Sequence, residues 1–350
     1  MQELEFEELS KPTFHAAPAR GERDYVALIE SAYDLASDDR SWLSTLAHVA
    51  FPILDRGSGV SSFFWDLSEA GKYRVRDATF VGCAPELHVG FRAGAARLTL
   101  RQARDMYVQG HPCKVIDNSV QYPRAYAAYN AHLPSVGFLV LSSAGFDGKG
   151  CSIAAPLATE TPLAPALARA LDQVARHIAA GMRLRRALRC SSTEPAPDAV
   201  LDSRGRLLHS EPQVAAQRER GGIVDAARRL LESRRVRRSR PEQAVELWRG
   251  LVLGRWSLVD HKDSDGKRFL LARQNAPVVR EPAALSAEER RAAALFSLLG
   301  SVKLVAYELG LAPSTISQAL KSASRKLGCR NRAELAALLQ PDPSGPKIHE

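Results

Sequence analysis

The sequence is poor in the features that mark several common classes of protein. Its 350 residues contain only five cysteines, which are scattered, odd in number and never spaced as Cys-x-x-Cys. This pattern argues against a disulfide framework and against a zinc site, and it favours reduced thiols. No apolar run approaches the ~20 residues that a membrane helix needs. We therefore predict no metal site and no membrane partner.

Motifs of catalysis and nucleotide binding are also missing from the sequence. There is no Gly-x-Ser-x-Gly elbow, no glycine-rich phosphate loop and no aspartate pattern of a receiver domain. The group Asp260, Asp263 and Asp265 lacks the spacing and the closing glutamate of a calcium loop, and a hairpin turn explains it better. The segment His111-Pro112-Cys113 could be a redox or metal site, but a loop histidine beside a buried thiol explains it better. We expect no enzymatic activity and no cofactor.

The composition is that of a soluble protein with more than one domain. Hydrophobic residues make up 45% of the chain and charged residues 25%, which are ordinary values for a globular protein. A chain of 350 residues is long enough for two or three domains. The acidic start MQELEFEELS has no apolar core, so no signal peptide is predicted. Together with the scattered cysteines, this favours a cytoplasmic location.

Charge is distributed unevenly along a chain whose net charge is +9. Residues 1–39 contain three Lys and Arg against ten Asp and Glu, a net of −7. Residues 183–240 contain fifteen Arg against seven Asp and Glu, a net of +8. The two regions could pair within the molecule. The basic region could instead be an ordinary solvated surface, or it could contact DNA.

Residues 24–190 have the pattern of one α/β domain. A helix is predicted from about Asp24 to Leu54, and two strand-like runs that turn at Glu69 to Gly71 follow it. A helical stretch over Glu86 to Gly110 then leads to a second hairpin, from Phe138 to Leu157, with a turn at Asp147-Gly148.

A long helix over about Leu163 to Arg189 closes this domain. Its apolar stripe can cover the sheet, or its later part, MRLRRALR, can project and pair with a second subunit. Helix, hairpin, helix, hairpin and exit helix together resemble a GAF domain, which implies a sensor. A small molecule is one candidate for the signal. The arrangement of acyl-homoserine-lactone sensors is not recognisable around Trp42, Trp65 or Tyr73, so that ligand is not carried over.

After a Pro/Ser linker that runs to Asp198, residues 198–276 are predicted to form a smaller α/β module. A hairpin that turns at Ser203 to Gly205 precedes a helix from Pro212 to about Arg235. A strand pair is predicted over Val245 to Asn275, with its turn at Asp263 to Gly266. This order of elements resembles a small PAS-like module.

The last sixth of the chain carries clear signals of short helices. Ser286 and Glu289 have the spacing of a capping box, and Gly300 is expected to end the helix that they begin. Ser301 is expected to cap a second helix, and Gly310 to end it in the left-handed conformation.

A third helix is predicted to begin at Pro313, which suits the first turn of a helix. Its apolar residues recur at the spacing of one buried stripe: Ile316, Leu320, Ala323 and Leu327. Asn331 and Glu334 are expected to cap a fourth helix, with Leu335 inward. Short helices with a tight turn between the second and the third have the outline of a helix-turn-helix.

The opposite face of the third helix predicts DNA binding. Small polar residues near a helix N-terminus allow the helix to enter the major groove, and the free N–H groups there favour phosphate. Residues 285–340 contain eight Lys and Arg against four Asp and Glu, a net of +4. A solvated face is the alternative interpretation. The candidate DNA-binding residues are Lys303, Ser314, Thr315, Ser317, Gln318, Lys321, Arg325 and Lys326.

Residues 285–340 also contain several specific short motifs. They are LSxEER from Leu285, Lys303, ELGLxPSTI from Glu308, RKLG from Arg325 and RxRAEL from Arg330. With these motifs the segment resembles the LuxR-type (FixJ/GerE-like) DNA-binding domain. The resemblance implies a bacterial transcription regulator that forms a homodimer and reads two half-sites of double-stranded DNA with its third helix. The sequence LWRGLVxGRWSLVDxxDSDGKRFLLARxN, from Leu247 to Asn275, resembles a block found between the sensor and the DNA-binding parts of some such regulators.

The sequence departs from the family pattern at several positions. The family usually has Ser or Thr at the position of Ala312, and loss of that cap costs about 1 kcal/mol. Basic residues common near Ser317 and Ala319 are absent. Each lost phosphate contact reduces the slope of log DNA affinity against log salt concentration by about one unit. A second interpretation therefore stays open, in which this domain binds a protein partner instead of DNA.

The sequence thus predicts an α+β multidomain fold. An acidic N-terminal arm over residues 1–23 precedes the GAF-like sensor, the PAS-like module and the DNA-binding domain, and residues 341–350 form a disordered tail. The predicted function is sequence-specific DNA binding under the control of the sensor.

Overall fold

The computed structural model describes residues 5–19, 21–69, 72–108, 113–117, 121–144, 148–190, 196–214, 217–253, 256–274 and 285–327, and residues 329, 332, 335 and 336. The chain divides into two compact units. The first consists of Met1–Ala144 and Gly148–Asn275, and the second of Gly145–Asp147 and Ala276–Glu350. Helices and two sheets together confirm a mixed α and β fold.

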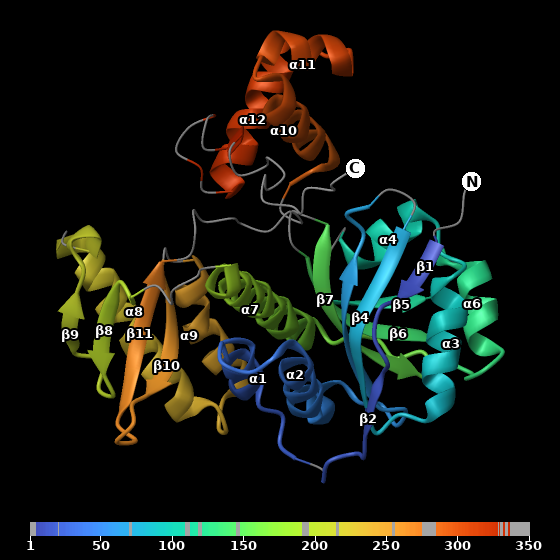
Figure 1. Cartoon of the computed structure of the whole chain (residues 1–350), viewed down its shortest axis with the longest axis horizontal. Coiled ribbons are helices and arrows are strands. Elements are labelled where there is room, and N and C mark those ends of the chain that lie inside the picture. Colours follow the sequence, from blue (N-terminus) through green and yellow to red (C-terminus); the bar gives the residue numbers. More distant parts are fainter. Residues whose placement is uncertain are drawn as a thin grey trace, which may run out of the picture. The chain divides into compact units, whose positions relative to one another are not determined.

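The larger sheet of the first unit has seven strands in the order β1-β4-β3-β7-β6-β5, and β2 also pairs with β4 (Figure 1). Its strands are β1 (Glu5–Glu8), β2 (Thr13–His15), β3 (Val60–Asp66), β4 (Lys72–Val81), β5 (Cys113–Asp117), β6 (Gly137–Ala144) and β7 (Lys149–Leu157). Two predicted hairpins are confirmed, because β3 pairs with β4 and β6 with β7, both antiparallel. Strand β5, which pairs with β6, was not predicted.

The acidic arm over residues 1–23 is joined to the large sheet, because this segment supplies β1 and β2, which run parallel to β4. Aromatic side chains anchor it: the ring of Phe6 lies 5.4 Å from that of Tyr73, and Phe14 stacks on Phe80 at 5.1 Å. Glu7 accepts a hydrogen bond of 2.5 Å from Arg74. The two short strands were not predicted, because acidic residues outnumber the few aromatic residues that attach this segment to the sheet.

One face of the large sheet is covered by α2 (Asp39–Leu54) and α7 (Pro165–Cys190), and α1 (Tyr25–Ala32) packs against both of these helices. The single helix predicted over residues 24–54 is wrong, because the helical conformation is interrupted between the end of α1 and the start of α2. There Asp34 accepts hydrogen bonds from the amides of Ala36 and Ser37, and Asp38 accepts one from the amide of Ser41. Short carboxylate side chains favour such local bonds over a continuous helix.

The opposite face is covered by α3 (Pro85–Ala95), α4 (Leu100–Tyr107) and α6 (Pro123–Asn130). The helix predicted over Glu86 to Gly110 is split, since Thr99 starts a new helix with a capping box. Helix α6 was not predicted. It packs closely on α3, where a Cβ at Gly94 would lie 3.1 Å from the carbonyl oxygen of Ala125.

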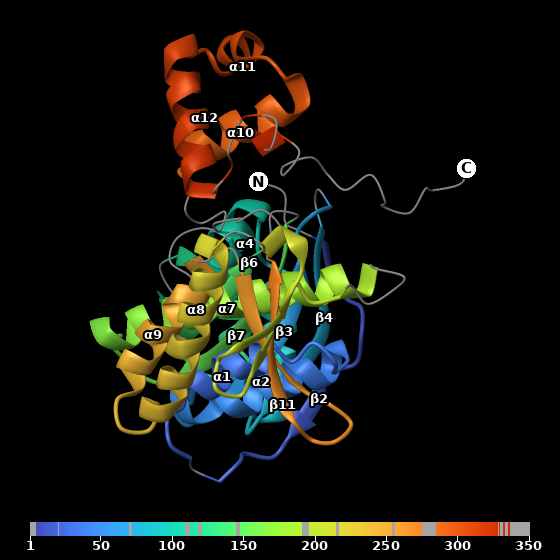
Figure 2. The same cartoon turned by 90° about the vertical axis from the view of Figure 1, so that its left-hand side faces the viewer.

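The smaller sheet has four antiparallel strands in the order β10-β11-β8-β9 (Figure 1). Figure 2 views the molecule from the side of this sheet, with β11 labelled. They are β8 (Ala199–Asp202), β9 (Leu207–Ser210), β10 (Trp256–Lys262) and β11 (Arg268–Gln274), with η1 (Pro212–Val214), α8 (Gln217–Val236) and α9 (Pro241–Leu253) beside them. The predicted turns with Gly205 and Gly266 are confirmed. The strand pair predicted from Val245 begins only at Trp256, because residues 241–253 form α9.

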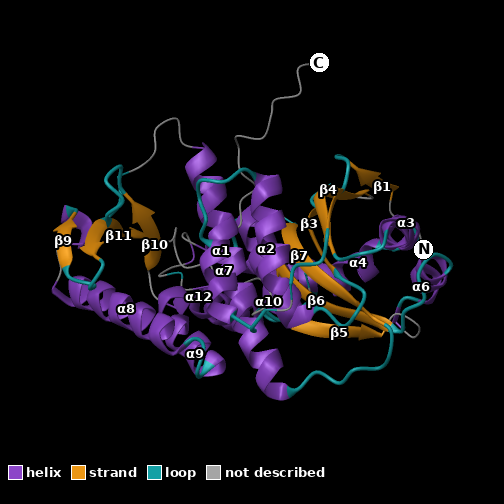
Figure 3. Ribbon diagram, turned by 90° about the horizontal axis from the view of Figure 1, so that it is seen from below, coloured by secondary structure: helices purple, strands orange, loops and turns teal. Residues whose placement is uncertain are grey.

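Residues 24–144, 148–190 and 198–275 lie in this one unit and share a core. Helices α1, α2 and α7 lie between the two sheets (Figure 3). The side chains of Trp248 on α9 and Ile178 on α7 belong to the same apolar cluster. In α7, His177 is fully buried, with its ring 6.2 Å from that of Trp248 and its Nδ1 3.1 Å from the Tyr33 hydroxyl.

The long helix α7 follows the first of its two predicted roles. It packs on the large sheet and on α1 and α9. Its later part does not project, because Met182, Leu184 and Arg185 are buried. The apolar residues there contact neighbours within the unit instead of presenting a surface for a second subunit.

The acidic and basic regions of the sequence meet within the first unit. Asp39 accepts hydrogen bonds from Arg185 at 3.3 Å and from Arg189 at 2.5 Å. Glu30 accepts a hydrogen bond of 2.5 Å from Arg234. For these residues the prediction of pairing inside the molecule is confirmed. Their charges hold α7 and α8 to the two N-terminal helices.

Candidate nucleic-acid face and candidate ligand cavity

The second unit contains α10 (Ala287–Leu299), α11 (Val302–Leu309) and α12 (Pro313–Leu327). The predicted capping box begins α10: the amide of Glu289 donates to the Ser286 hydroxyl at 3.1 Å, and the Ser286 amide donates to Glu289 Oε2 at 2.6 Å. Gly300 ends this helix with φ 64°, and Gly310 ends α11 with φ 63°. Ser301 precedes α11, but its side chain does not make the predicted capping bond.

The apolar stripe of α12 is buried as predicted. Ile316, Leu320, Ala323 and Leu327 are each 0% exposed. They pack against residues of α10 and α11, among them Phe296 and Val305. Burial of a Leu or Ile side chain stabilises a fold by roughly 1.5–3 kcal/mol. The stripe therefore fixes which face of α12 points outward.

The candidate DNA-binding residues share one surface only in part. Ser314, Gln318, Lys321 and Arg325 are exposed and recur at helical spacing on α12. Lys303 is exposed on α11. Thr315, Ser317 and Lys326 are half-buried. Among the described residues, Lys303, Lys321 and Arg325 have no ion-pair partner, so their charges face solvent.

Lys326 makes an internal contact that its predicted role did not include. Its Nζ lies 2.7 Å from Oε2 of Glu289, the capping carboxylate of α10. Burial raises the pKa of Glu289, but hydrogen bonds from Lys326, Ser322 and the Ser286 amide outweigh it and lower the pKa to about 2. Lys326 therefore ties α12 to the start of α10. The sequence did not indicate this ion pair, because Lys326 and Glu289 are 37 positions apart in the chain.

Several sequence predictions for this unit lie outside the described residues. They include the caps Asn331 and Glu334 of the fourth helix and the tail over residues 341–350. Two residues of the fourth-helix segment are described: Leu335 is buried as expected, and Arg332 is exposed.

Sequence analysis did not identify the exposed apolar side chains of α11. Tyr307 is 87% exposed and Leu304 is 53% exposed. Both lie away from the buried residues Val305 and Ala306 of the same helix.

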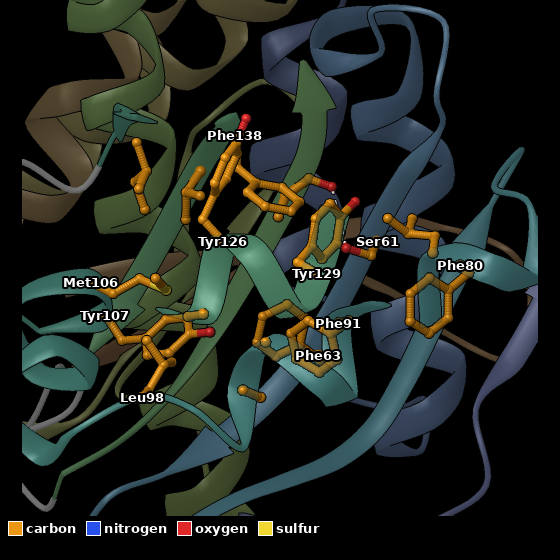
Figure 4. A pocket seen from close by; sticks show the side chains of 17 residues that line it. Ser61, Phe63, Phe80, Phe91, Leu98, Met106, Tyr107, Tyr126, Tyr129 and Phe138 are labelled. Carbon is orange, nitrogen blue, oxygen red and sulfur yellow. Dashed lines mark hydrogen bonds between the residues drawn. The ribbon is translucent and has the colours of Figure 1, made fainter. Parts of the chain in front are cut away.

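The first unit contains an apolar cavity of about 70 Å³ (Figure 4). Side chains of the large sheet form one wall, and those of α3, α4 and α6 form the other. Its lining residues are Ser61, Phe63, Phe80, Leu87, Phe91, Gly94, Ala95, Leu98, Met106, Tyr107, Ile116, Ala125, Tyr126, Tyr129, Phe138, Val140 and Ala154. None of these is charged. The sequence gave little sign of the cavity, because its aromatic residues come from elements far apart in the chain.

Hydroxyl groups provide the polar side-chain chemistry of the cavity. Tyr107 accepts a hydrogen bond of 2.8 Å from Tyr73, and Ser61 donates to the carbonyl of Ala154 at 3.3 Å. Tyr129 is 3% exposed, and its hydroxyl makes no hydrogen bond of ordinary geometry to the described residues. Burial raises the pKa of Tyr129, and the nearby Ser135 offsets this in part.

The described residues show no sign of two other kinds of site. They contain no group of three His, Cys, Asp or Glu side chains placed to hold a metal ion. No helix formed by them is long and apolar enough to cross a membrane. Cys113 is buried, its amide donates to Asp172 at 3.0 Å, and burial raises its pKa to about 12. His111 lies outside the described residues.

Comparison with models of known protein families gives no match to any part of the chain. Comparison with curated proteins finds no relative of significant similarity.

Proposed function

We propose that the chain is a bacterial transcription regulator of the LuxR type that reads the major groove of DNA with α12. The observation that carries this proposal is the division of α12 into a fully buried apolar stripe and an exposed stripe with Ser314, Gln318, Lys321 and Arg325. A helix held in this way presents small polar groups at its N-terminus and cations further along. That order suits base edges and phosphates, respectively.

Each exposed group has a distinct role in this proposal. Ser314 and Gln318 donate to or accept from base edges near the start of α12, where the short Ser314 side chain allows close approach. Lys321 contacts a base edge, and Arg325 and Lys303 neutralise phosphates at the rim. Thr315 and Ser317 contribute through their exposed parts. Lys326 positions α10 and α12, because its charge is engaged by Glu289.

The proposed regulator acts as a cytoplasmic homodimer under the control of the first unit. A dimer contacts two half-sites, which multiplies the affinity of a small reading unit. The apolar cavity of the first unit is the proposed place of signal binding, because concave apolar sites with a few polar groups are typical of small-molecule sites.

DNA affinity across a salt series tests the proposal. The full-length protein is titrated into labelled random and own-promoter duplexes, and anisotropy is measured from low to physiological salt. We expect a negative slope of log affinity against log salt and a preferred sequence. The Lys321→Ala variant should bind roughly three- to tenfold more weakly at the preferred site.

Arg291→Ala is the matched control, since Arg291 is an exposed cation of α10 outside the candidate face. It should change affinity by less than about twofold. Equal loss in both variants would mean that non-specific charge carries the binding. An unchanged affinity in Lys321→Ala would contradict the placement of α12 in the groove.

A second function, binding of a protein partner by the same unit, is favoured by α11. Tyr307 and Leu304 are large, exposed and only three positions apart. Exposed aromatic residues are enriched at protein interfaces. This alternative predicts no salt-dependent DNA affinity and a hetero-complex that Tyr307→Ser weakens while Lys321→Ala leaves it intact.

A further inference from the structure

We propose that a basic cleft on the large sheet binds hydrogen phosphate, a small tetrahedral anion that carries a proton of its own. The cleft lies on the sheet face of Phe64, whose ring stacks on Trp42 of α2, and the apolar cavity lies on the opposite face. Its volume is about 160 Å³. A cavity of about 150 Å³ accepts benzene, and phosphate has fewer non-hydrogen atoms, so this anion fits and a nucleotide does not.

The lining of the cleft has more positive than negative groups. Its cations are Arg74 and Arg76 of β4, Lys149 of β7 and Arg186 of α7, and its carboxylate is Asp66 of β3. Cations around a partly enclosed site attract an anion more strongly than they would in open water, because the protein lowers the local dielectric constant. The lining therefore favours an anionic ligand.

The register of the strands places three of these groups in one row. Asp66 lies opposite Arg74 on β4 and opposite Lys149 on β7. Side chains that lie directly opposite one another on neighbouring antiparallel strands have Cβ atoms roughly 4.5–5.5 Å apart. Arg76 is two residues further along β4, and its guanidinium lies over the Phe64 ring at 4.9 Å. An anion above Asp66 is therefore flanked by cations on both sides.

Carboxylates outside the lining orient the two arginines without using all of their donors. Arg74 donates from Nε to Glu7 and pairs through Nη1 with Glu69. Arg76 donates from Nη1 to Asp39. Because a guanidinium has five N–H donors in a planar fork, these contacts leave the Nη2 groups of both arginines for a ligand. Side chains that are already held in place lose little conformational entropy when the anion binds.

The positive charge of the cleft is not cancelled by Asp39. This carboxylate accepts hydrogen bonds from Arg185 and Arg189 as well as from Arg76, so its single negative charge is shared by three cations. Arg186 adds a further positive charge from the same part of α7. Cations therefore stay in excess beside the cleft.

Asp66 makes the site selective for an anion that carries a proton. Its Oδ1 accepts hydrogen bonds from the amide and the hydroxyl of Ser68, and its Oδ2 lies 3.4 Å from Nζ of Lys149. Burial raises the pKa of Asp66, but the Ser68 bonds and the charge of Lys149 outweigh it and lower the pKa, so the carboxylate is ionised at neutral pH. An ionised carboxylate can only accept hydrogen bonds. It therefore repels sulfate and DNA phosphodiesters, which have no proton to donate, and accepts the P–OH of hydrogen phosphate.

Calorimetric titration of the full-length protein, at neutral pH and constant ionic strength, compares inorganic phosphate with sulfate. The two anions have the same shape, and only phosphate carries a proton under these conditions. We expect phosphate to bind at least about tenfold more tightly, the ratio that a hydrogen bond to a charged group provides. Asp66→Asn should reduce this ratio to less than about threefold, because an amide can also donate to sulfate.

Variants of the cations locate the binding. Arg186→Gln should weaken phosphate binding roughly tenfold, because charge-assisted hydrogen bonds to the anion are lost. Arg183→Gln is the matched control, since Arg183 is another half-buried arginine of α7 and does not line the cleft. It should change the affinity by less than about twofold, because solvent ions screen a more distant charge. Lys149→Gln takes the place of Arg186→Gln if thermal melting shows that Arg186→Gln is unfolded.

A phosphate preference that Asp66→Asn removes, with weaker binding in Arg186→Gln than in Arg183→Gln, supports the proposal. Equal binding of the two anions by the wild type, a preference that Asp66→Asn retains, equal loss in the two arginine variants, or no heat of binding at millimolar phosphate overturns it. Because the titrations contain no DNA, a protein that binds phosphate but not DNA contradicts only the proposed function. A protein that binds DNA but not phosphate contradicts only this inference.

Discussion

The helices that cover the two faces of the seven-stranded sheet differ in length, and only one face has the cavity described above. The 26-residue helix α7 and the 16-residue helix α2 cover one face, where Trp42 and Phe64 stack at 5.7 Å. Helices of 11, 8 and 8 residues cover the other face, where the cavity lies. Neighbouring residues of β3 show the contrast, since Phe64 belongs to the dense core and Trp65 to the core beside the cavity.

This contrast teaches that helix length and side-chain size together decide whether a core closes. Long helices rich in alanine can approach the sheet and α1 closely along many turns. On the other face, the short helices α3, α4 and α6 bring large rings such as Phe91, Tyr107 and Tyr129 to the sheet, and the cavity lies among these rings. The dense face is therefore expected to tolerate less change than the cavity face.

The largest effect that tests this comparison is expected from two glycines. A Cβ at Gly181 of α7 would overlap the carbonyl oxygen of Ala32, whereas a Cβ at Gly94 of α3 would lie 3.1 Å from that of Ala125. Gly181→Ala should lower the free energy of unfolding by about 3 kcal/mol or more, and Gly94→Ala by less than about 1 kcal/mol. Urea unfolding followed by circular dichroism measures both. Similar losses would mean that the two faces are equally tight.

A smaller effect is expected from the arginines that tie the dense face together. The Arg185 side chain is 3% exposed, lies over the Trp42 ring at 5.0 Å and donates to the Ser37 carbonyl at 2.6 Å and to the Asp34 carbonyl. Arg185→Met should cost about 3 kcal/mol, because it leaves buried acceptors unpaired.

Arg189→Met is the matched control, since the Arg189 side chain is 45% exposed and pairs with the same Asp39. It should cost less than about 1 kcal/mol. If Arg189→Met lowered the free energy of unfolding as much as Arg185→Met does, the stabilising effect of these arginines would come from attraction to Asp39 and not from burial.

The smallest effect is a pH dependence of the dense face. Burial, with a further contribution from Arg176, lowers the pKa of His177 from 6.5 to about 3. The folded protein therefore keeps this imidazole neutral, while the unfolded chain takes up a proton below pH 6.5. Stability is unaffected above pH 6.5 and is lost as the pH falls toward 3. At pH 5 the loss should be about 2 kcal/mol.

His177→Gln should reduce this loss between pH 6.5 and 5, and His209→Gln should leave it in place, because the His209 side chain is 63% exposed. The free energy of unfolding at several pH values decides between them. An equal acid dependence in the wild type and in His177→Gln would mean that other groups cause it.

Prediction from the sequence succeeded where local chemistry decides the conformation. The capping box of Ser286, the glycine ends at Gly300 and Gly310 and the buried stripe of α12 depend on contacts within a few residues, and all are confirmed. It failed where neighbours in space decide. Strand β5, helix α6 and the two N-terminal strands were missed, because their partners lie far away in the chain.

The candidate site divides in the same way. The outward face of α12 follows from helical periodicity, so the exposure of Gln318 and Lys321 could be predicted. The engagement of Lys326 by Glu289 and the cavity around Tyr129 could not.

The sequence by itself determined the ends of α10 and α11, the start of α12, the two central hairpins and the polar face of α12, because backbone caps, turns and periodicity are short-range. Only the tertiary structure decided that α7 is buried between two sheets, that acidic and basic regions pair across the first unit, and that short helices leave a cavity beside the large sheet. Those outcomes depend on the packing of surfaces that are separated by up to 204 residues, and no local pattern indicates which surfaces will meet.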